Sequence, residues 1–218
     1  MEPSAFLSPE PIMNSSNPFD LSARNWDADP LKVARARAVA EAIQDMVPLA
    51  PGFSALEYGC GTGLVSFALA SRLGQVTLAD SSPGMLAVVA EKLAASPMTH
   101  LRPLALDLTA EPLPADRFQL IYTLMTLHHV PDVDRILADF STLLTSPGYL
   151  CVADLDAEDG SFHGSDFSGH RGFDRDELGR RARSAGFATV EFRTVYRITK
   201  ESSSGQKEFP LFLMVAGK

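Results

Sequence analysis

The stretch Ser54-Ala-Leu-Glu-Tyr-Gly-Cys-Gly-Thr-Gly63 decides the fold of this chain. Its apolar run Ala55–Tyr58 predicts a short buried strand, and Gly59, Gly61 and Gly63 follow at a spacing of two residues. A helical pattern begins directly after the last glycine. Because glycine lacks a side chain and accepts backbone angles that other residues avoid, a ligand can lie against such a turn. The stretch therefore predicts a strand, a ligand-facing turn and a helix start.

Length and composition indicate one domain. The chain has 218 residues, 45% of them apolar and 21% charged, which is enough to bury one substantial core and too little for two large domains. Residues 1–24 contain four prolines among serines and asparagines, so we expect a flexible tail or a strap there. We expect residues 25–218 to form the single domain.

Charge and apolar patterning exclude several protein classes. The 27 acidic and 19 basic residues give a net charge of −8, so we expect no nucleic-acid partner, because phosphate binding needs clustered Lys and Arg. No run of about 18 apolar residues exists to span a membrane, and the N-terminus lacks a signal-peptide pattern. Cys60 and Cys151 match no disulfide framework or zinc spacing, so we expect free thiols and no metal site. These features suit a cytoplasmic protein.

Strand and helix patterns alternate along the chain. The expected strands are Ala55–Tyr58, Gln75–Ala79, Leu101–Leu106, Phe118–Tyr122, Tyr149–Ala153, Thr189–Thr199 and Phe209–Ala216. The expected helices cover about 30–47, 64–73, 83–94, 132–144 and 175–185. Five strand–helix alternations predict an α/β fold with a doubly wound parallel sheet and helices on both faces. Because only a polar loop, 200–207, separates the last two strands, we expect them to form an antiparallel hairpin at a sheet edge.

Polar residues recur at the carboxyl ends of the first five strands, where open α/β sheets bind ligands. They are Glu57, Asp80, Asp107, Thr123 and Asp154. Asp80 lies 21 residues after Gly59, which suits a carboxylate that accepts hydrogen bonds from a ribose. Leu64 stands where the NAD fingerprint has its third glycine, and Glu57 beside the turn favours a cationic ligand over a pyrophosphate. A NAD-dependent oxidoreductase is therefore disfavoured.

Four motifs in order resemble those of one enzyme family. They are Leu-Glu-Tyr-Gly-Cys-Gly-Thr-Gly, Leu-Ala-Asp80-Ser-Ser-Pro-Gly-Met85, Leu-Asp107-Leu and Leu-His-His-Val-Pro-Asp. From about Asn25 onward the chain resembles class I S-adenosylmethionine-dependent methyltransferases of the small-molecule type, type 11/25-like. The resemblance implies a Rossmann-like seven-stranded sheet of order 3-2-1-4-5-7-6, with strand 7 antiparallel, and release of S-adenosylhomocysteine as the cofactor product.

The resemblance also implies which residues bind the cofactor. The turn Gly59, Cys60 and Gly61 would hold the methionyl part of the cofactor, Glu57 would bind its ammonium, and Thr123 would border the methionyl tail. Asp80 would bind the ribose hydroxyls. Around the adenine, Ser81 and Met85 would flank the base, Asp107 would accept from its amino group and Leu108 would line its ring.

His128 and His129 lie after the fourth expected strand and supply candidates for a general base, with Asp154 as a residue that orients one of them. The pair and the later acid are similar to those of sugar O-methyltransferases of this fold. We expect catalysis from His129 first and His128 second. The alternative is that the histidines only shape the pocket.

The segment 155–173 is the least family-like part and is predicted to be a lid over the acceptor. Its acidic and histidine side chains have no fixed ligand spacing, so a mobile loop is favoured over a metal site. The favoured function is methyl transfer to a small-molecule acceptor, at a hydroxyl. The alternatives are methylation of RNA or protein, and a non-catalytic module that binds S-adenosylmethionine. Arsenic methylation is disfavoured because only two cysteines exist. The oligomeric state is left open.

Overall fold

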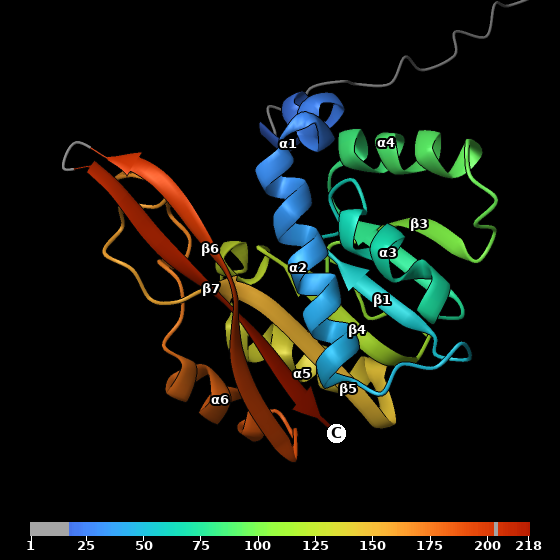
Figure 1. The fold of residues 1–218 in the computed structure, drawn as a ribbon. Coiled ribbons are helices and arrows are strands. Elements are labelled where there is room, and N and C mark those ends of the chain that lie inside the picture. The colour runs from blue at the N-terminus through green and yellow to red at the C-terminus, as the bar shows by residue number, and fades with distance from the viewer. Residues whose placement is uncertain (1–17, 203–204) are drawn as a thin grey trace, which may run out of the picture.

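Strand β1 (Ala55–Tyr58) is buried along its whole length and pairs in parallel with β2 on one side and β4 on the other. Three apolar or aromatic side chains and one acid in this segment thus lie inside the molecule, as a central parallel strand requires. The computed structural model describes residues 18–202 and 205–218, and Figure 1 shows the sheet between its helices.

The strands that flank β1 follow the expected order. They are β2 (Val76–Asp80), β3 (Leu101–Ala105), β4 (Phe118–Leu124), β5 (Leu144–Leu155), β6 (Thr189–Ser202) and β7 (Gly205–Gly217). The sheet order is β3-β2-β1-β4-β5-β7-β6, with β7 antiparallel to both β5 and β6. This confirms the predicted fold class. It also places the carboxyl ends of β1, β2, β4 and β5 along one edge of the sheet.

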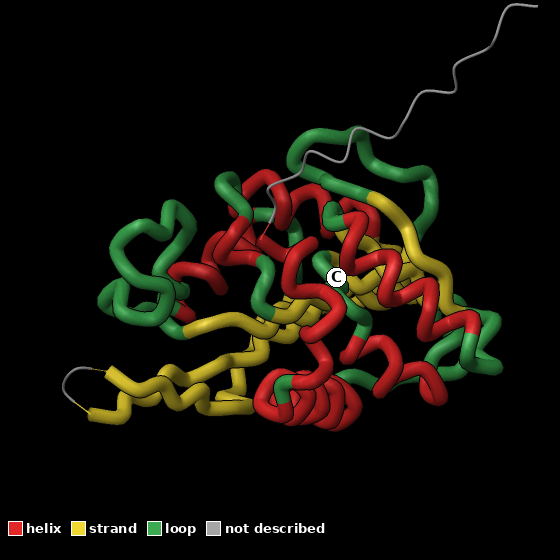
Figure 2. The backbone as a smooth tube through the Cα atoms, turned by 90° about the horizontal axis from the view of Figure 1, so that it is seen from above, coloured by secondary structure: helices red, strands yellow, loops and turns green. Residues whose placement is uncertain are grey.

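The helices divide between the two faces (Figures 1 and 2). They are α1 (Pro18–Ser22), η1 (Ala23–Ala28), α2 (Pro30–Met46), α3 (Leu64–Leu69), η2 (Ala70–Arg72), α4 (Pro83–Ala94), η3 (Leu127–His129), α5 (Val133–Leu143) and α6 (Arg175–Ser184). Apolar residues of α2, α3 and α4 form the core on one face. Those of α5 and α6 form the core on the other. Helices therefore cover both faces of the sheet.

The last two strands extend further than the apolar pattern indicates. Pairing in the β6–β7 hairpin continues to Ser202 opposite Gly205, so most of the expected polar loop 200–207 is strand. The expectation of a loop was wrong, because main-chain hydrogen bonds between antiparallel strands do not need apolar side chains. In Figure 1 this end of the hairpin projects beyond the rest of the sheet.

Of the expected tail, residues 1–17 lie outside the described part of the chain. Residues from Pro18 onward form α1 and η1, which pack against α4. Helix α2 then begins at Pro30, and the side chain of Asp29 caps it by accepting a hydrogen bond from the amide of Leu31 at 2.9 Å. Among the described residues, every helix is too short or too polar to cross a membrane.

Candidate active site

The glycine turn after β1 has the left-handed backbone that only glycine adopts readily. Gly59, Gly61 and Gly63 have φ angles of 68°, 54° and 80°. A Cβ atom on Gly59 would lie 2.4 Å from the side chain of Thr126, whereas one on Gly61 would meet nothing nearer than 4.0 Å. The first glycine is therefore required by packing and the second leaves open space beside the turn.

Asp80, at the end of β2, holds the turn in place. Its Oδ2 accepts a hydrogen bond from the amide of Gly61 at 2.7 Å, and its Oδ1 accepts one from the amide of Ser82 at 2.8 Å. Burial raises the pKa of Asp80, while these backbone N–H groups oppose the rise. Met85 is buried beside the turn, with its sulfur 4.0 Å from the position of a Cβ on Gly61, and Ser81 is exposed.

Glu57 lies under the turn rather than at its surface. Its carboxylate accepts hydrogen bonds from the amide of Ser66, at 3.1 Å, and from the Ser66 hydroxyl, which lies 2.6 Å from the hydroxyl of Tyr122. Burial raises the pKa of Glu57 to about 8. Ser66 and Tyr122 were not predicted as site residues, because their sequence positions match a helix and a core strand.

Asp107 follows β3 and stabilises its own loop. Its Oδ1 accepts hydrogen bonds from the amide of Thr109 at 2.9 Å and from the Thr109 hydroxyl at 2.6 Å. Leu108 is fully buried, and its amide donates to the hydroxyl of Tyr58 at 3.2 Å. Thr123 in β4 is buried, and its Oγ1 has no hydrogen-bond partner within residues 18–202 and 205–218.

Segment 18–28, which consists of α1 and η1, contacts the glycine turn and the turn that follows β2. Asp20 accepts hydrogen bonds from the Ser82 hydroxyl and from the amide of Gly84. Asp27 accepts one from the Thr62 hydroxyl and forms an ion pair with Lys92 at 2.8 Å. The sequence gives no short-range signal for these contacts, because the partners lie 35 to 65 residues apart.

Trp26 lies in the same segment, half-buried, with its Nε1 4.0 Å from the position of a Cβ on Gly61. The nitrogen of Lys32 sits over its ring at 3.7 Å from the centroid. Segment 18–28 therefore brings an aromatic side chain to the glycine turn.

His128 and Asp154 form a buried pair at the ends of η3 and β5. Nδ1 of His128 lies 2.7 Å from Oδ1 of Asp154, and the two side chains are 1% and 0% exposed. Asp154 Oδ2 also accepts from the backbone amide of His128 at 3.2 Å. With Nδ1–H donating to the carboxylate, Nε2 of His128 carries the lone pair. Nε2 is buried and has no hydrogen-bond partner among the described residues.

His129 belongs to a ring cluster around that pair. Its ring lies 4.1 Å from that of His128 and 5.5 Å from that of Phe19. From the segment 155–173, His163 stacks on Phe167 at 4.0 Å, and the His163 ring lies 5.0 Å from His128. Burial lowers the pKa of both His129 and His163 to about 4, so both stay neutral at pH 7.

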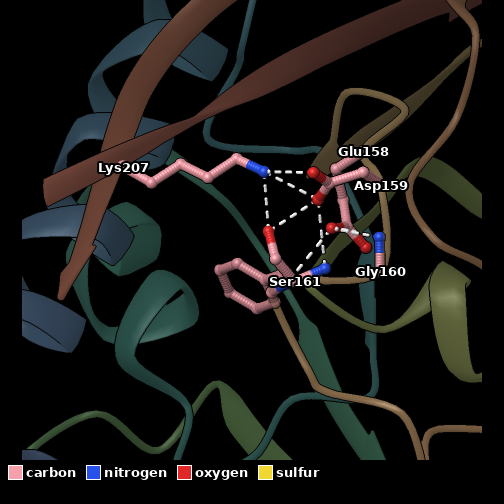
Figure 3. Close-up of polar contacts among 6 residues, drawn as sticks. Glu158, Asp159, Gly160, Ser161 and Lys207 are labelled. Carbon is pink, nitrogen blue, oxygen red and sulfur yellow. Dashed lines mark hydrogen bonds and ion pairs between the residues drawn. The ribbon is translucent and has the colours of Figure 1, made fainter. Parts of the chain in front are cut away.

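The N-terminal part of the loop that carries His163 is held by two ion pairs. Lys207 of β7 donates to the carboxylate of Asp159 at 2.6 and 2.7 Å and to the Ser161 hydroxyl at 2.7 Å, as Figure 3 shows. Arg175 forms a bidentate ion pair with Asp156, in which Nε donates to Oδ1 at 2.6 Å and Nη2 donates to Oδ2 at 2.7 Å. The loop thus rests on the projecting end of the β6–β7 hairpin.

A surface cleft of about 290 Å³ opens next to the ring cluster. It is lined by His129, Pro131, Phe167, Ser168, Gly169 and His170. The cleft therefore joins one candidate catalytic residue, His129, to residues of the 155–173 loop.

Comparisons with known proteins identify the family. A family model described as a methyltransferase domain matches residues 55–148. A ubiquinone biosynthesis O-methyltransferase of Xanthomonas campestris is 30% identical over 168 residues, which cover 72% of this chain and 70% of that protein. The chain belongs to the class I S-adenosylmethionine-dependent methyltransferases. The motifs from which the sequence predicted this family lie within the matched residues.

Two further similarities extend this finding. A Schizosaccharomyces pombe methyltransferase that is named uncharacterized is 31% identical over 121 residues, 52% of this chain and 43% of that protein, so the chain spans less than half of it. The methyltransferase bound to the Haloferax volcanii Trm112 activator has a TM-score of 0.73 at 17% identity, covering 92% of this chain and 97% of that one. At this identity the likeness concerns the fold.

The site of this methyltransferase fits S-adenosylmethionine. Gly61 leaves space where a side chain would stand, and Asp80 is held by backbone amides at the end of β2, where a ribose diol binds in this type of fold. Thr123 Oγ1, which is buried and bonded to none of the described residues, lies at the carboxyl end of β4. These features supply acceptors and open space for the cofactor.

Proposed function

We propose that this methyltransferase transfers a methyl group to a hydroxyl of a small-molecule acceptor, with His128 as general base. The observation that carries the proposal is the His128–Asp154 pair, in which Nδ1 is held by a carboxylate and Nε2 is buried without a partner in the part of the chain that the structure describes. Such an arrangement orients an imidazole and fixes its tautomer, as in other histidine bases.

The cofactor supplies a methyl group already activated by its sulfonium. We assign the turn Gly59–Gly61 to its methionyl part, with Glu57 beneath as the balancing carboxyl and Thr123 beside it. Asp80 binds the ribose, and Ser81, Met85, Asp107 and Leu108 surround the adenine. The residues of segment 18–28 cover this site, since Asp27 binds Thr62 in the glycine turn and Asp20 binds Gly84 at the start of α4.

His128 is a better base than His129, although the sequence favoured His129. Asp154 contacts His128, and no hydrogen bond from the described part of the chain orients the His129 ring. The pKa of His129 is about 4, so it is a weak base at pH 7. His129 then serves as part of the wall of the acceptor site.

Catalysis requires one proton transfer and one displacement. Nε2 of His128 would take the proton of the acceptor hydroxyl, and the bound cofactor would supply the methyl group that the oxygen receives, with the carbon–sulfur electron pair leaving on sulfur. Asp154 stabilises the imidazolium that results, which later loses its proton to water. The rings of His163 and Phe167 exclude water from the reacting atoms.

The loop 155–173 is the proposed acceptor lid. His128 is 1% exposed, so an acceptor reaches Nε2 only if the rings of His163 and Phe167 move.

The proposal of an oxygen acceptor is supported by the relative from Xanthomonas campestris, which is named an O-methyltransferase. The net charge of −8 supports a small acceptor in the cytoplasm over RNA.

The test is S-adenosylhomocysteine production from a set of small hydroxyl compounds that includes catechol and 3,4-dihydroxybenzoate. We expect His128→Ala to abolish turnover and His129→Ala to retain most of it, with S-adenosylhomocysteine affinity unchanged in both. Equal turnover in His128→Ala and wild type overturns the proposed base. Methyl label retained in protein or RNA, with none in small molecules, overturns the proposed acceptor class.

A further inference from the structure

The surface cleft beside the ring cluster is built on the turn that carries His128. The backbone amide of His170, one of its lining residues, donates to the carbonyl of His128 at 2.8 Å. The ring Nε2 of His170 donates to the carbonyl of Val130 at 3.0 Å. Gly169, which also lines the cleft, lies so close to the His128 carbonyl that a Cβ atom would collide with it. The cleft is therefore fixed by direct contacts to the main chain of the proposed base.

Two aromatic rings contact both the cleft and the base. His129 and Phe167 line the cleft, and their rings lie 4.1 and 5.8 Å from the ring of His128. The two rings are nearly perpendicular, at 85°, with their centres 5.3 Å apart. The movement of Phe167 that the proposed lid requires would therefore connect the cleft with Nε2 of His128.

The residues that line the cleft favour an uncharged ring compound. None of the six is a lysine, arginine, aspartate or glutamate. Burial lowers the pKa of His129 to about 4, so its ring is neutral at pH 7. Phe167, His129 and Pro131 supply rings against which a flat apolar molecule can pack. A charged substituent would lose water in this cleft without gaining an opposite charge.

Two polar groups in the cleft match a hydroxyl of a ligand. Because Nε2 of His170 carries the hydrogen that Val130 accepts, Nδ1 has the lone pair when the ring is neutral. Neither this Nδ1 nor the hydroxyl of Ser168 hydrogen-bonds to any residue in the ranges 18–202 and 205–218. A hydroxyl can donate to Nδ1 and accept from Ser168 at the same time. The cleft thus offers a hydroxyl site about one ring away from the proposed base.

The volume of the cleft sets the size of the ligand. A cavity of about 150 Å³ can hold one benzene molecule. The cleft has about 290 Å³ and is open to the surface, so it has room for one substituted ring or two fused rings.

We propose that this cleft binds the acceptor, and that the substrate class is uncharged aromatic compounds with at least two hydroxyls. This inference rests on the proposed function of the same site. One hydroxyl binds Nδ1 of His170 and the hydroxyl of Ser168. The other reaches Nε2 of His128 when Phe167 moves, and His129 packs against the ring between them.

The experiment compares four naphthalene compounds by calorimetry with S-adenosylhomocysteine present. The probes are 2,3-dihydroxynaphthalene, 2,6-dihydroxynaphthalene, 2-naphthol, which lacks the second hydroxyl, and 6-hydroxy-2-naphthoate, which has a carboxylate in its place. We expect wild type to bind at least one diol about fivefold more tightly than 2-naphthol, because the second hydroxyl adds hydrogen bonds. The carboxylate should bind more weakly than that diol.

Two substitutions of Ser168 test the cleft. Ser168→Ala removes one hydroxyl and should reduce the advantage of the diol over 2-naphthol. Ser168→Phe fills the cleft and should weaken the binding of every probe by about tenfold or more. Unchanged S-adenosylhomocysteine affinity and unfolding temperature show that Ser168→Phe is folded; if it is not, the smaller Ser168→Ala decides the test.

Ser165→Phe is the matched control. Ser165 is an exposed serine of the same loop that bonds the Asp166 side chain at 3.0 Å and does not line the cleft. We expect its probe affinities to equal those of wild type. An equal loss of affinity in Ser165→Phe and Ser168→Phe would reveal an effect of the loop as a whole and overturn the cleft as the binding site.

The outcomes separate this inference from the proposed function. If neither diol binds wild type more tightly than 2-naphthol, including when no probe binds, the hydroxyl site is overturned. Tighter binding of the carboxylate than of either diol overturns the uncharged class. Methyl transfer to small hydroxyl compounds that Ser168→Phe leaves unaffected supports the proposed function and overturns only the cleft. Diol binding that Ser168→Phe abolishes, without any methyl transfer in wild type, supports the cleft and counts against the proposed function.

Discussion

Asp154 binds His128 at two points, since Oδ1 lies 2.7 Å from the ring Nδ1 and Oδ2 accepts from the backbone amide at 3.2 Å. The first contact fixes the ring and the second fixes the η3 turn on which the ring stands. A single carboxylate thus sets both the position and the tautomer of the proposed base. Because the pair is buried, solvent does not compete for either contact.

Replacing Asp154 by Asn should remove the acceptor that holds Nδ1–H. We expect kcat to fall by about 10²-fold or more, since a general base in the wrong tautomer loses most of its effect. S-adenosylhomocysteine affinity should stay within about twofold of wild type. Steady-state kinetics and calorimetry measure the two effects. If Asp154 and His128 act as a unit, the kcat of the double variant Asp154→Asn, His128→Gln is no lower than that of His128→Gln alone. Losses of kcat that multiply fully in the double variant would argue against a functional pair.

Gly59→Ala should distort the cofactor turn. Its φ of 68° is unfavourable for alanine, and the new Cβ would lie 2.4 Å from the Thr126 side chain. We expect a loss of about 2 kcal/mol or more in the free energy of unfolding, with weaker S-adenosylhomocysteine binding. Urea unfolding and calorimetry test this. Gly52→Ala is the control, because nothing lies within 4 Å of its Cβ position. Equal losses in both variants would contradict the role given to the turn.

The sheet order was predictable from local patterns. Each strand–helix unit carries its own apolar periodicity, and the short connection after Thr199 leaves only a hairpin for the last two strands. The strand-end acids were predictable for the same reason, because parallel strands end at one edge. Asp80 and Asp154 lie where this reasoning placed them.

Side-chain partners were not predictable in the same way. Adjacent residues in a 3₁₀ turn point about 120° apart, so the pair His128–His129 does not reveal which ring meets Asp154. Asp20 and Ser82 are joined only by tertiary packing of segment 18–28. Arg35 occupies an ordinary polar position in the helical pattern, and only the packed structure shows that its Nε is buried.

Lys207→Ala should loosen the loop 155–173. The ion pair with Asp159, which lowers the pKa of that carboxyl, joins the loop to β7 (Figure 3). Exposed ion pairs add little to global stability, so the unfolding curve should barely move. The local effect should appear as several-fold faster proteolytic cleavage within residues 156–173. Arg197→Ala is the control, since it removes an ion pair with Glu208 on the same hairpin. Equal cleavage rates in the two variants would refute the anchor.

Glu57 should make stability fall as pH rises. Its pKa is about 8 in the folded chain and about 4.5 when unfolded, so between these values the folded state keeps a proton that the unfolded state releases. This stabilisation is complete below pH 4.5 and disappears as pH passes through 8, with a slope of up to about 1.4 kcal/mol per pH unit. Glu57→Gln keeps an acceptor for Ser66 and does not titrate. Urea unfolding from pH 5 to 8 should therefore show wild type losing stability relative to Glu57→Gln. If the free energy of unfolding depends on pH equally in wild type and Glu57→Gln, Glu57 is already ionised in the folded chain. The same measurement with saturating S-adenosylmethionine tests the cofactor's charge. A weaker decrease of wild-type stability with pH would show that the positive charge of the cofactor favours the Glu57 carboxylate.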